Sequence, residues 1–300
     1  MHALNNQKGI ALVVTLLALV LITAMVVEFS YGVYTGTNNL YNWRDSQRLS
    51  IMAKSGINVS AKILSEKLNG ETYSYPGSME LPVENSFEDF NGTIVVRIED
   101  ETSKFNVNSL VSSGEVFNGT AYKSFQKLLK ILSLDEKIAD RVIDWIDKDN
   151  VAKLPDSEQN AKNSALLSVD ELLLINGISK EDYDKLLPYV TVYGTRDNLF
   201  ININGAEKPV LQCLSDEINE ELAQRVIEYR KINPFEDITQ MQKVDGVTSM
   251  IYNPISSMIT VKGTHFSINS TAASEGVKRI IVTVLNTSSS SAMIEYWKEY

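Results

Sequence analysis

Residues 7–27 read QKGIALVVTLLALVLITAMVV, a short polar segment that runs directly into an uncharged apolar stretch. The apolar part, from Ile10 to Val27, would span about 27 Å as a helix at roughly 1.5 Å per residue. That length is close to the roughly 30 Å hydrocarbon core of a bilayer. The stretch therefore predicts a helix that anchors the chain in a membrane and leaves roughly 270 residues beyond it.

The join at Gly9 separates three interpretations of this anchor. A cleaved secretory signal has a shorter apolar core followed by a small-residue site, whereas Glu28 follows Val27 directly. An ordinary signal anchor accounts for the apolar run but not for the glycine before it. The join resembles a type IV prepilin leader, in which a peptidase cuts after the glycine and leaves the apolar helix on the product. We therefore predict a leader over residues 1–9 and cleavage between Gly9 and Ile10.

Position 14 departs from the common pilin pattern. Once Ile10 is the first residue, the fifth residue is Val14, where most pilin-like proteins carry glutamate. A carboxylate inside the membrane is costly unless it is paired, and in pilins its partner is the N-terminal ammonium of a neighbouring subunit. A subunit with valine there cannot neutralise such a neighbour. The absence favours a subunit at one end of a filament, and it is equally compatible with a plain membrane anchor.

The rest of the chain has the composition of a globular protein. Of its 300 residues, 44% are hydrophobic and 22% are charged, as is typical of a folded protein. The roughly 270 residues beyond the anchor are enough for two domains. The net charge of −10 argues against binding to nucleic acid or to anionic lipid. Cys213 is the single cysteine, so an intrachain disulfide is excluded. Its apolar neighbours indicate a position in the core.

Four regions follow one another along the chain and predict an α+β fold. Apolar residues at helical spacing continue to Leu68, which predicts one helix of about 60 residues. Residues 93–99 alternate between polar and apolar side chains, as in a half-buried strand, and three more strands are expected after position 264. Together these strands would form an antiparallel sheet that covers the pilin-like helix. The expected divisions are 10–110 for the helix and first strands, 111–258 for an inserted all-α domain and 259–300 for the closing strands.

Two segments of the helical region look like helix–hairpin–helix motifs, one around Gly177 and a weaker one around Gly246. In many proteins this motif holds a DNA phosphate, which requires nearby cations. Residues 168–187 contain two lysines and five acidic residues, a net charge of −3. We therefore predict that the hairpin joins two packed helices and that the protein does not bind nucleic acid.

An acidic cluster lies in and after the segment DWIDKDN. It contains Asp144, Asp147 and Asp149, and Asp156 and Glu158 follow in the next loop. Carboxylates on a flexible loop suit a hard cation such as Ca²⁺, which takes six to eight oxygen ligands. The loop lacks the glycine and the final glutamate of an EF-hand. The residues alone therefore leave two interpretations, a calcium site or a solvated acidic end of a helix.

No set of residues indicates catalysis. His265 has no evident partner, and His2 lies in the predicted leader. The chain contains no Gly-x-Ser-x-Gly, His-Glu-x-x-His or P-loop motif. We therefore predict that the protein is not an enzyme.

An ordered series of segments resembles the minor pseudopilin K family of the bacterial type II secretion system. In chain order the segments are QKGIALVV (7–14), IEDETSKFNVNSL (98–110), VIDWIDKDN (142–150), VDELLLINGISKEDYDKLLPYVTVYG (169–194) and FININGAEKPVLQCL (200–214). Each segment alone is a weak signal, but their order along the chain is specific.

The resemblance implies a non-enzymatic subunit anchored in the bacterial inner membrane, with its globular part in the periplasm. Such a subunit caps the tip of a short pseudopilus together with I-type and J-type minor pseudopilins, and it helps to export folded proteins across the outer membrane. The resemblance also implies that a prepilin peptidase removes the leader and that the new N-terminus is methylated. It implies calcium in the helical domain, which we carry onto Asp144, Asp147 and Asp149. The chain departs from the family at residues 151–160, where VAKLPDSEQN replaces the usual acidic, glycine-containing stretch.

Three alternatives lie outside this family. A minor pilin of a type IV pilus would share the leader and the sheet but not the long helical insertion. A membrane-anchored DNA-binding protein of an uptake system would need basic residues at the hairpin of Gly177. An extracytoplasmic hydrolase would need a convergent catalytic site.

Overall fold

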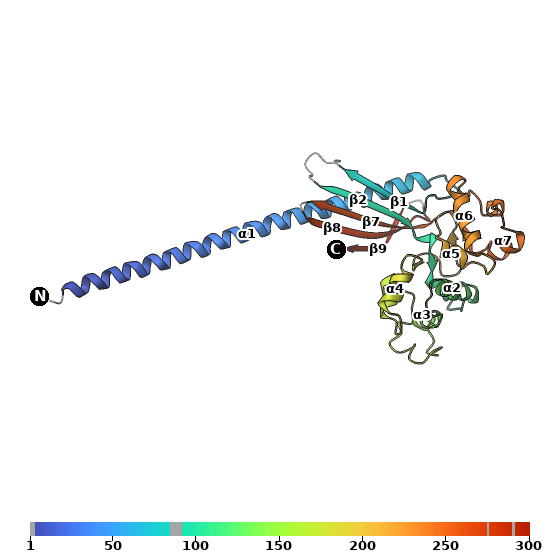
Figure 1. The fold of residues 1–300 in the computed structure, drawn as a ribbon, viewed down its shortest axis with the longest axis horizontal. Coiled ribbons are helices and arrows are strands. Elements are labelled where there is room, and N and C mark those ends of the chain that lie inside the picture. Colours follow the sequence, from blue (N-terminus) through green and yellow to red (C-terminus); the bar gives the residue numbers. More distant parts are fainter. Residues whose placement is uncertain (1–3, 85–91, 275, 290–291) are drawn as a thin grey trace.

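A computed structural model describes residues 4–84, 92–274, 276–289 and 292–300, and it shows a head at one end of a single long helix (Figure 1). Helix α1 (Leu4–Leu68) has 65 residues. It begins inside the predicted leader, of which residues 1–3 lie outside the described residues, and it ends at the predicted position. Its most apolar 18-residue window has a mean hydropathy of 3.0, and none of that window is buried. By length and composition, α1 is therefore able to cross a membrane.

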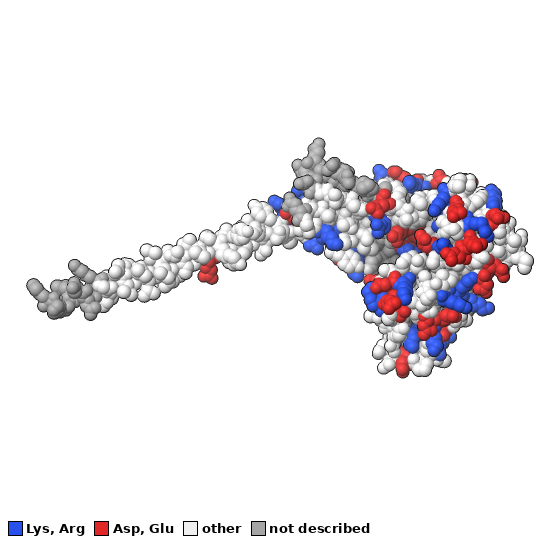
Figure 2. Space-filling model, in the orientation of Figure 1, with Lys and Arg blue, Asp and Glu red and all other residues white. Residues whose placement is uncertain are grey.

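A stalk separates the apolar window from the head. Residues 28–45 of α1 remain mostly exposed, and Ser46 is the first buried residue after position 8. These 18 or so residues add about 27 Å of helix between the apolar window and the head. Figure 2 shows that Lys, Arg, Asp and Glu side chains gather on the head while the rod is almost bare of them. Glu28 is the single charged residue between positions 9 and 43.

A five-stranded antiparallel sheet in the order β1-β2-β7-β8-β9 forms the first part of the head. The strands are β1 (Ser78–Glu84), β2 (Thr93–Asp100), β7 (His265–Ser274), β8 (Val277–Asn286) and β9 (Met293–Glu299). The last four agree with the sequence prediction, whereas β1 was not predicted. Pro82 disfavours a strand except at the edge of a sheet, and β1 is an edge strand.

The second half of α1 packs on one face of this sheet. Leu49, Ala53 and Ile57 are almost fully buried against apolar side chains of β2, β7 and β8. Gly56 faces the sheet so closely that a β-carbon would collide with Ser270 Oγ. The predicted α+β arrangement, a long helix on an antiparallel sheet with a helical insertion, is therefore confirmed.

The helical region is inserted between β2 and β7, which are neighbours in the sheet. Its limits differ from the expected 111 and 258. Strand β3 (Phe105–Asn106) pairs with β4 (Val190–Thr191), and strand β6 (Ile259–Thr260) pairs with β5 (Ile201–Asn202). Both pairs are parallel and belong to the helical region. The sequence pattern identifies a short extended segment but not the strand that it pairs with.

Two units of similar structure make up the helical region. The first contains η1 (Glu101–Ser103), β3, η2 (Val107–Leu110), α2 (Gly119–Ile131), α3 (Ile138–Ile146), η3 (Val169–Leu174), α4 (Lys180–Leu186) and β4. The second contains β5, α5 (Lys208–Gln212), α6 (Glu220–Ile232), η4 (Ile238–Lys243), α7 (Ser249–Ile255) and β6. In the second unit the segment between β5 and η4 thus forms two helices, α5 and α6. One continuous apolar core serves both units and is separate from the core beneath α1.

The two units repeat the same contacts around one buried asparagine. Asn108 in the first unit donates from Nδ2 to two backbone carbonyls and accepts a backbone N–H at Oδ1. Asn204 in the second unit makes the same three hydrogen bonds. The partners are Leu166 and Val192 for the first asparagine, and Phe235 and Val261 for the second. The helical region is therefore a tandem repeat, of which the sequence revealed only the weak likeness at Gly246.

Candidate metal centre and membrane anchor

The predicted cleavage site lies on the exposed surface of α1. Ile10 is 59% exposed, and a β-carbon built on Gly9 would meet no atom within 4 Å. Val14, one turn further along, is also exposed. Gly9 and Ile10 are therefore both accessible, and the helix continues through the join without a break.

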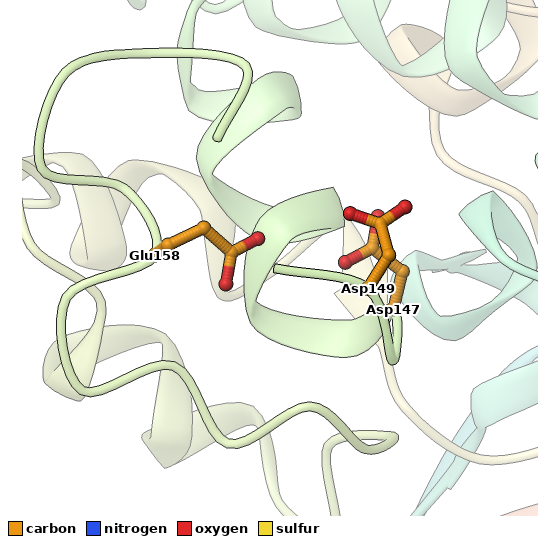
Figure 3. A group of neighbouring side chains, drawn as sticks. All are labelled: Asp147, Asp149 and Glu158. Atoms are coloured by element: carbon orange, nitrogen blue, oxygen red, sulfur yellow. The ribbon is translucent and has the colours of Figure 1, made fainter. Parts of the chain in front are cut away.

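The acidic cluster forms where α3 ends. Asp147 caps the C-terminus of α3 in an extended conformation, and the chain then loops back over residues 148–163. Positive φ angles at Asp156, Asn160 and Asn163 fold this loop tightly, since asparagine and aspartate tolerate the left-handed region better than most residues. The loop brings Glu158 to face Asp147 and Asp149 (Figure 3). One carboxylate oxygen from each of these three residues lies within 4.8 Å of the others.

Asp144 lies outside this group of three. It is fully buried on α3, and its Oδ2 accepts hydrogen bonds from Lys153 N at 2.8 Å and from Ser157 Oγ. Asp144 therefore holds the middle of the loop against α3, while Glu158 supplies the third carboxylate. The sequence placed Glu158 in the acidic loop but gave no sign that the loop folds back onto the end of α3.

Electrostatics in the cluster favour a bound cation. Burial, reinforced by the charges of Asp149, Asp144 and Glu158, raises the pKa of Asp147 to about 6. Burial and the charges of Asp144 and Asp149 also raise the pKa of Glu158. Gathering like charges in a partly desolvated place costs free energy, and a positive ion among them would remove that cost.

Several buried oxygen atoms here have no hydrogen-bond partner. They are Asp144 Oδ1, Asp147 Oδ1, Glu158 Oε1 and Asn163 Oδ1. Buried polar atoms are normally paired, so four such oxygens at the end of α3 and in the loop after it need an explanation. All the atoms that could coordinate a metal here are oxygens, which are the ligands of Ca²⁺ sites. The residues present therefore fit a hard cation such as Ca²⁺.

The two hairpins are closed by arginines of their own units. Arg141 on α3 donates to the carbonyl oxygen of Asn176 at 3.0 Å, and Arg225 on α6 donates to that of Asp245 at 3.0 Å. Each guanidinium packs against the hairpin glycine that follows its acceptor. Both motifs thus join a 3₁₀ helix to an α-helix inside a packed unit.

The remaining residues with potential chemistry occupy structural positions. Cys213 is buried, and burial raises the pKa of its thiol to about 12. His265 is buried beside Thr264 and lies 3.5 Å from Glu295, and burial lowers the pKa of its imidazole. Neither residue belongs to a group of nucleophile, base and orienting acid among the parts of the chain that the structure describes.

A long helix that is apolar enough to cross a membrane and packs on an antiparallel sheet is the architecture of a pilin-like subunit. Family models described as "Type II secretion system (T2SS), protein K" match residues 103–195 and 201–262. These ranges coincide with the two helical units and together cover about half of the chain. The chain belongs to the protein K family of the type II secretion system, a family of minor pseudopilins rather than of enzymes.

Relatives in other bacteria support this assignment. Type II secretion system protein K of Pseudomonas aeruginosa is 27% identical over 255 residues, which cover 75% of this chain and 73% of the relative. The protein K of Pectobacterium carotovorum is 29% identical over 230 residues, which cover 67% of each chain. A chain in the crystal structure of the GspK-GspI-GspJ complex of enterotoxigenic Escherichia coli has the same fold. It aligns with a TM-score of 0.72 and 19% identity over 87% of this chain and 99% of that chain.

Proposed function

We propose that this minor pseudopilin caps the tip of a periplasmic pseudopilus and thereby helps to move folded proteins across the outer membrane. The observation that carries the proposal is the place of the helical region. The second unit lies at the end of the molecule opposite to the N-terminus of α1, beyond the sheet, and the first unit projects to the side of the head, next to β9 (Figure 1). A subunit stacked above this one would have to occupy the same space. The protein therefore suits the end of a filament and not its repeating shaft.

Val14 supports the same position. A pilin subunit uses a glutamate near its N-terminus to neutralise the terminal ammonium of a neighbour, and a charge inside the membrane is costly without a partner. Val14 is apolar, and the charge nearest to it on the described part of α1 beyond Gly9 is Glu28. At about 1.5 Å per residue, Glu28 lies roughly 21 Å further along the helix. This subunit thus offers no counter-charge to a subunit beyond it.

The partners in this proposal are I-type and J-type minor pseudopilins. The similar solved structure is a complex of three proteins, GspK, GspI and GspJ. The long exposed stalk and apolar window of α1 give such partners a surface along which parallel helices can pack. The anchor would lie in the inner membrane, with Lys8 on the cytoplasmic side, in keeping with the positive-inside rule, and the head in the periplasm.

Complementation of secretion and labelling of isolated pseudopili together test the tip position. A strain that lacks the chain should lose secretion, and the full-length chain should restore it. Labelled chain should appear at one end of isolated pseudopili, as seen by gold labelling and electron microscopy. Label distributed along the whole shaft would contradict the proposal.

We also propose that the cluster at the end of α3 binds Ca²⁺. Asp147, Asp149 and Glu158 would hold the ion, and Asn163 offers a further buried oxygen. Bound calcium would tie the loop of residues 148–163 to the end of α3. Its contribution would be structural, because the ion would cross-link two segments of the first unit that the sequence separates.

A further inference from the structure

A short aromatic segment follows the apolar part of α1. Phe29, Tyr31 and Tyr34 lie within six residues, and their side chains are 72%, 69% and 66% exposed. The next five residues, 35–39, are all small or polar. We call the three aromatic side chains the aromatic girdle. Apolar exposure concentrated in this way marks a surface that contacts another protein or a membrane.

The aromatic girdle surrounds the helix instead of lining one face. Successive residues of an α-helix are turned by about 100°, so Tyr31 and Tyr34 share one side of α1 and Phe29 lies almost opposite to them. The part of α1 that packs on the sheet differs, because buried residues such as Leu49 and Ala53 are spaced by four and stay on one side. A neighbouring helix would cover only one side of the girdle. Lipid surrounds a membrane helix and covers both sides.

The distance from the predicted cleavage site to the girdle matches the thickness of a bilayer. At about 1.5 Å per residue, Phe29 lies about 29 Å and Tyr34 about 36 Å along α1 from Ile10. The hydrocarbon core is about 30 Å thick, and the headgroups bring the whole bilayer to about 40–45 Å. With Ile10 at the cytoplasmic edge of the core, the girdle falls among the headgroups of the opposite leaflet. Tyrosine is enriched at this level because its ring is apolar and its hydroxyl is polar.

The polar groups of α1 fit the same depth. Residues 10–27 contain two hydroxyl side chains, those of Thr15 and Thr23, and both donate to a carbonyl oxygen of α1 itself. A hydroxyl without a partner would be costly in hydrocarbon. Glu28 directly precedes the girdle, so its carboxylate can reach water at the edge of the hydrocarbon core.

A fixed depth matters at the other end of α1. Removal of the leader would leave an ammonium on Ile10, and Val14 offers it no carboxylate. An unpaired charge inside the hydrocarbon core is costly, so this ammonium has to stay at the cytoplasmic surface. Movement of α1 toward the periplasm would draw the ammonium into the core. The girdle opposes that movement, because its rings would leave the headgroup layer for water.

We propose that the aromatic girdle lies among the lipid headgroups of the periplasmic leaflet and fixes the depth of α1 in the inner membrane. The inference rests on the proposed function, because it takes the inner membrane as the place of the anchor. It adds which residues of this chain contact the headgroups and which movement of the helix they prevent.

The experiment measures the depth of α1 in vesicles of phosphatidylethanolamine and phosphatidylglycerol. A spin label is attached to the full-length chain at Leu21→Cys or at Ser30→Cys. Cys213→Ala removes the single native thiol, which lies in the core of the helical region, apart from α1. The depth of the label follows from its accessibility to oxygen, which enters hydrocarbon, and to a nickel chelate, which stays in water.

Two triple variants are compared with this chain. The test variant replaces the girdle with serine. The matched control replaces three apolar residues of the stalk that are also exposed but lie about 15–20 Å beyond the hydrocarbon core. The substitutions are Phe29→Ser, Tyr31→Ser and Tyr34→Ser in the test variant, and Leu40→Ser, Tyr41→Ser and Trp43→Ser in the control.

In the chain with its girdle, the label at position 30 should lie at headgroup level and the label at position 21 inside the core. In the test variant, the label at position 21 should lie about 3 Å or more closer to the periplasmic surface, which is two residues of helix, because serine enters water readily. The control should show no such movement.

Three results would overturn the inference. A label at position 30 that lies in water, or a test variant that does not move, overturns it and leaves the membrane anchor intact. A label at position 21 that the nickel chelate reaches in the chain with its girdle shows that α1 does not enter the bilayer, which overturns the anchor as well. A depth that changes when the chain is diluted with lipid shows that the girdle packs against a second copy, and the inference is then wrong.

Discussion

Asn108 and Asn204 occupy the same position in the two helical units and make the same three hydrogen bonds. Both side chains are almost fully buried, with 3% and 1% of their surface exposed. Each ties the beginning of its unit to a central loop and to the strand that closes the unit. The amide group of asparagine is suited to this place because it donates twice and accepts once.

Replacing either asparagine should destabilise the protein by a similar amount. Asn108→Ala leaves two carbonyls and one N–H buried without a partner. Asn204→Ala leaves the carbonyl and N–H of Phe235 in the same state, while the carbonyl of Val261 still accepts from Ser74 N. Each substitution should cost about 2–4 kcal/mol of unfolding free energy. Denaturant titration of the full-length protein measures the loss. Asn253→Ala, at an exposed position of α7, is the control and should change little. A large loss of unfolding free energy for only one of the two variants would show that the asparagine is not equally important in both units.

Gly9→Val should block removal of the leader. The expected cut requires a small residue before Ile10, and Gly9 stands exposed on α1 with no atom near its missing β-carbon. The intact mass after co-expression with a prepilin peptidase gives the answer. Gly32→Val is the matched control, because Gly32 is equally open on the same helix, and that variant should be processed. A product that begins at Ile10 in the Gly9→Val variant would remove the prepilin interpretation.

Loss of the acidic cluster should abolish stabilisation by calcium. In the unchanged chain, added Ca²⁺ should raise the melting temperature, because an ion that binds only the folded state stabilises it by mass action. The combined Asp147→Ala and Asp149→Ala variant, and the Glu158→Gln variant, should lose most of this rise. Asp156→Asn lies on the same loop but outside the group of three and should retain it. Equal melting of all variants with calcium and with chelator would show that the carboxylates are only structural.

The effect of calcium should depend on pH through Asp147. Its folded-state pKa of about 6 lies above the ordinary 3.8, so the proton stabilises the folded state. In chelator, this contribution is complete below about pH 4 and is lost as the pH rises through about 6. Calcium binding has the opposite dependence, because the ion needs the carboxylate. Melting curves between pH 5 and 7.5 should therefore show a calcium-induced rise that grows with pH, and a rise that does not change with pH would contradict this account.

Gly56→Val should loosen α1 from the sheet. The added side chain would overlap Ser270 Oγ and approach Val96, and overpacking of this kind typically costs about 1–3 kcal/mol. Gly36→Val is the control, because Gly36 lies on the exposed stalk. Denaturant titration should show a clear loss for the first variant and almost none for the second.

The sequence predicted the elements whose periodicity is long or strict. Helix α1 and strands β2, β7, β8 and β9 all have apolar patterns that identify the face they bury. Edge strand β1 escaped prediction because Pro82 lies within it. The sequence placed strands β3 and β6 outside the helical region, whereas both strands pair within it. Each strand has only two paired residues, and its partner strand is distant in sequence, so no pattern indicated the pairing.

The metal centre was predictable only in part. Asp147 and Asp149 are near neighbours on one short segment, so their proximity follows from the sequence. Glu158 joins them only because positive φ angles at Asp156 and Asn160 fold the loop back. Those angles have no periodic signal in the sequence. The repeat likewise escaped detection, since the loop at residues 147–163 lengthens the first unit and shifts its later segments out of register with the second.

The pairing of Asp100 with Phe266 in the sheet has a consequence for the origin of the molecule. The helical region leaves β2 and enters β7 at adjacent points, so its two ends occupy the space of a simple β-turn. If a short turn replaced residues 101–264, β2 and β7 would form an ordinary hairpin within the same antiparallel sheet. Insertion of the tandem repeat at this turn of a smaller pilin-like protein would leave every strand pairing of the sheet unchanged.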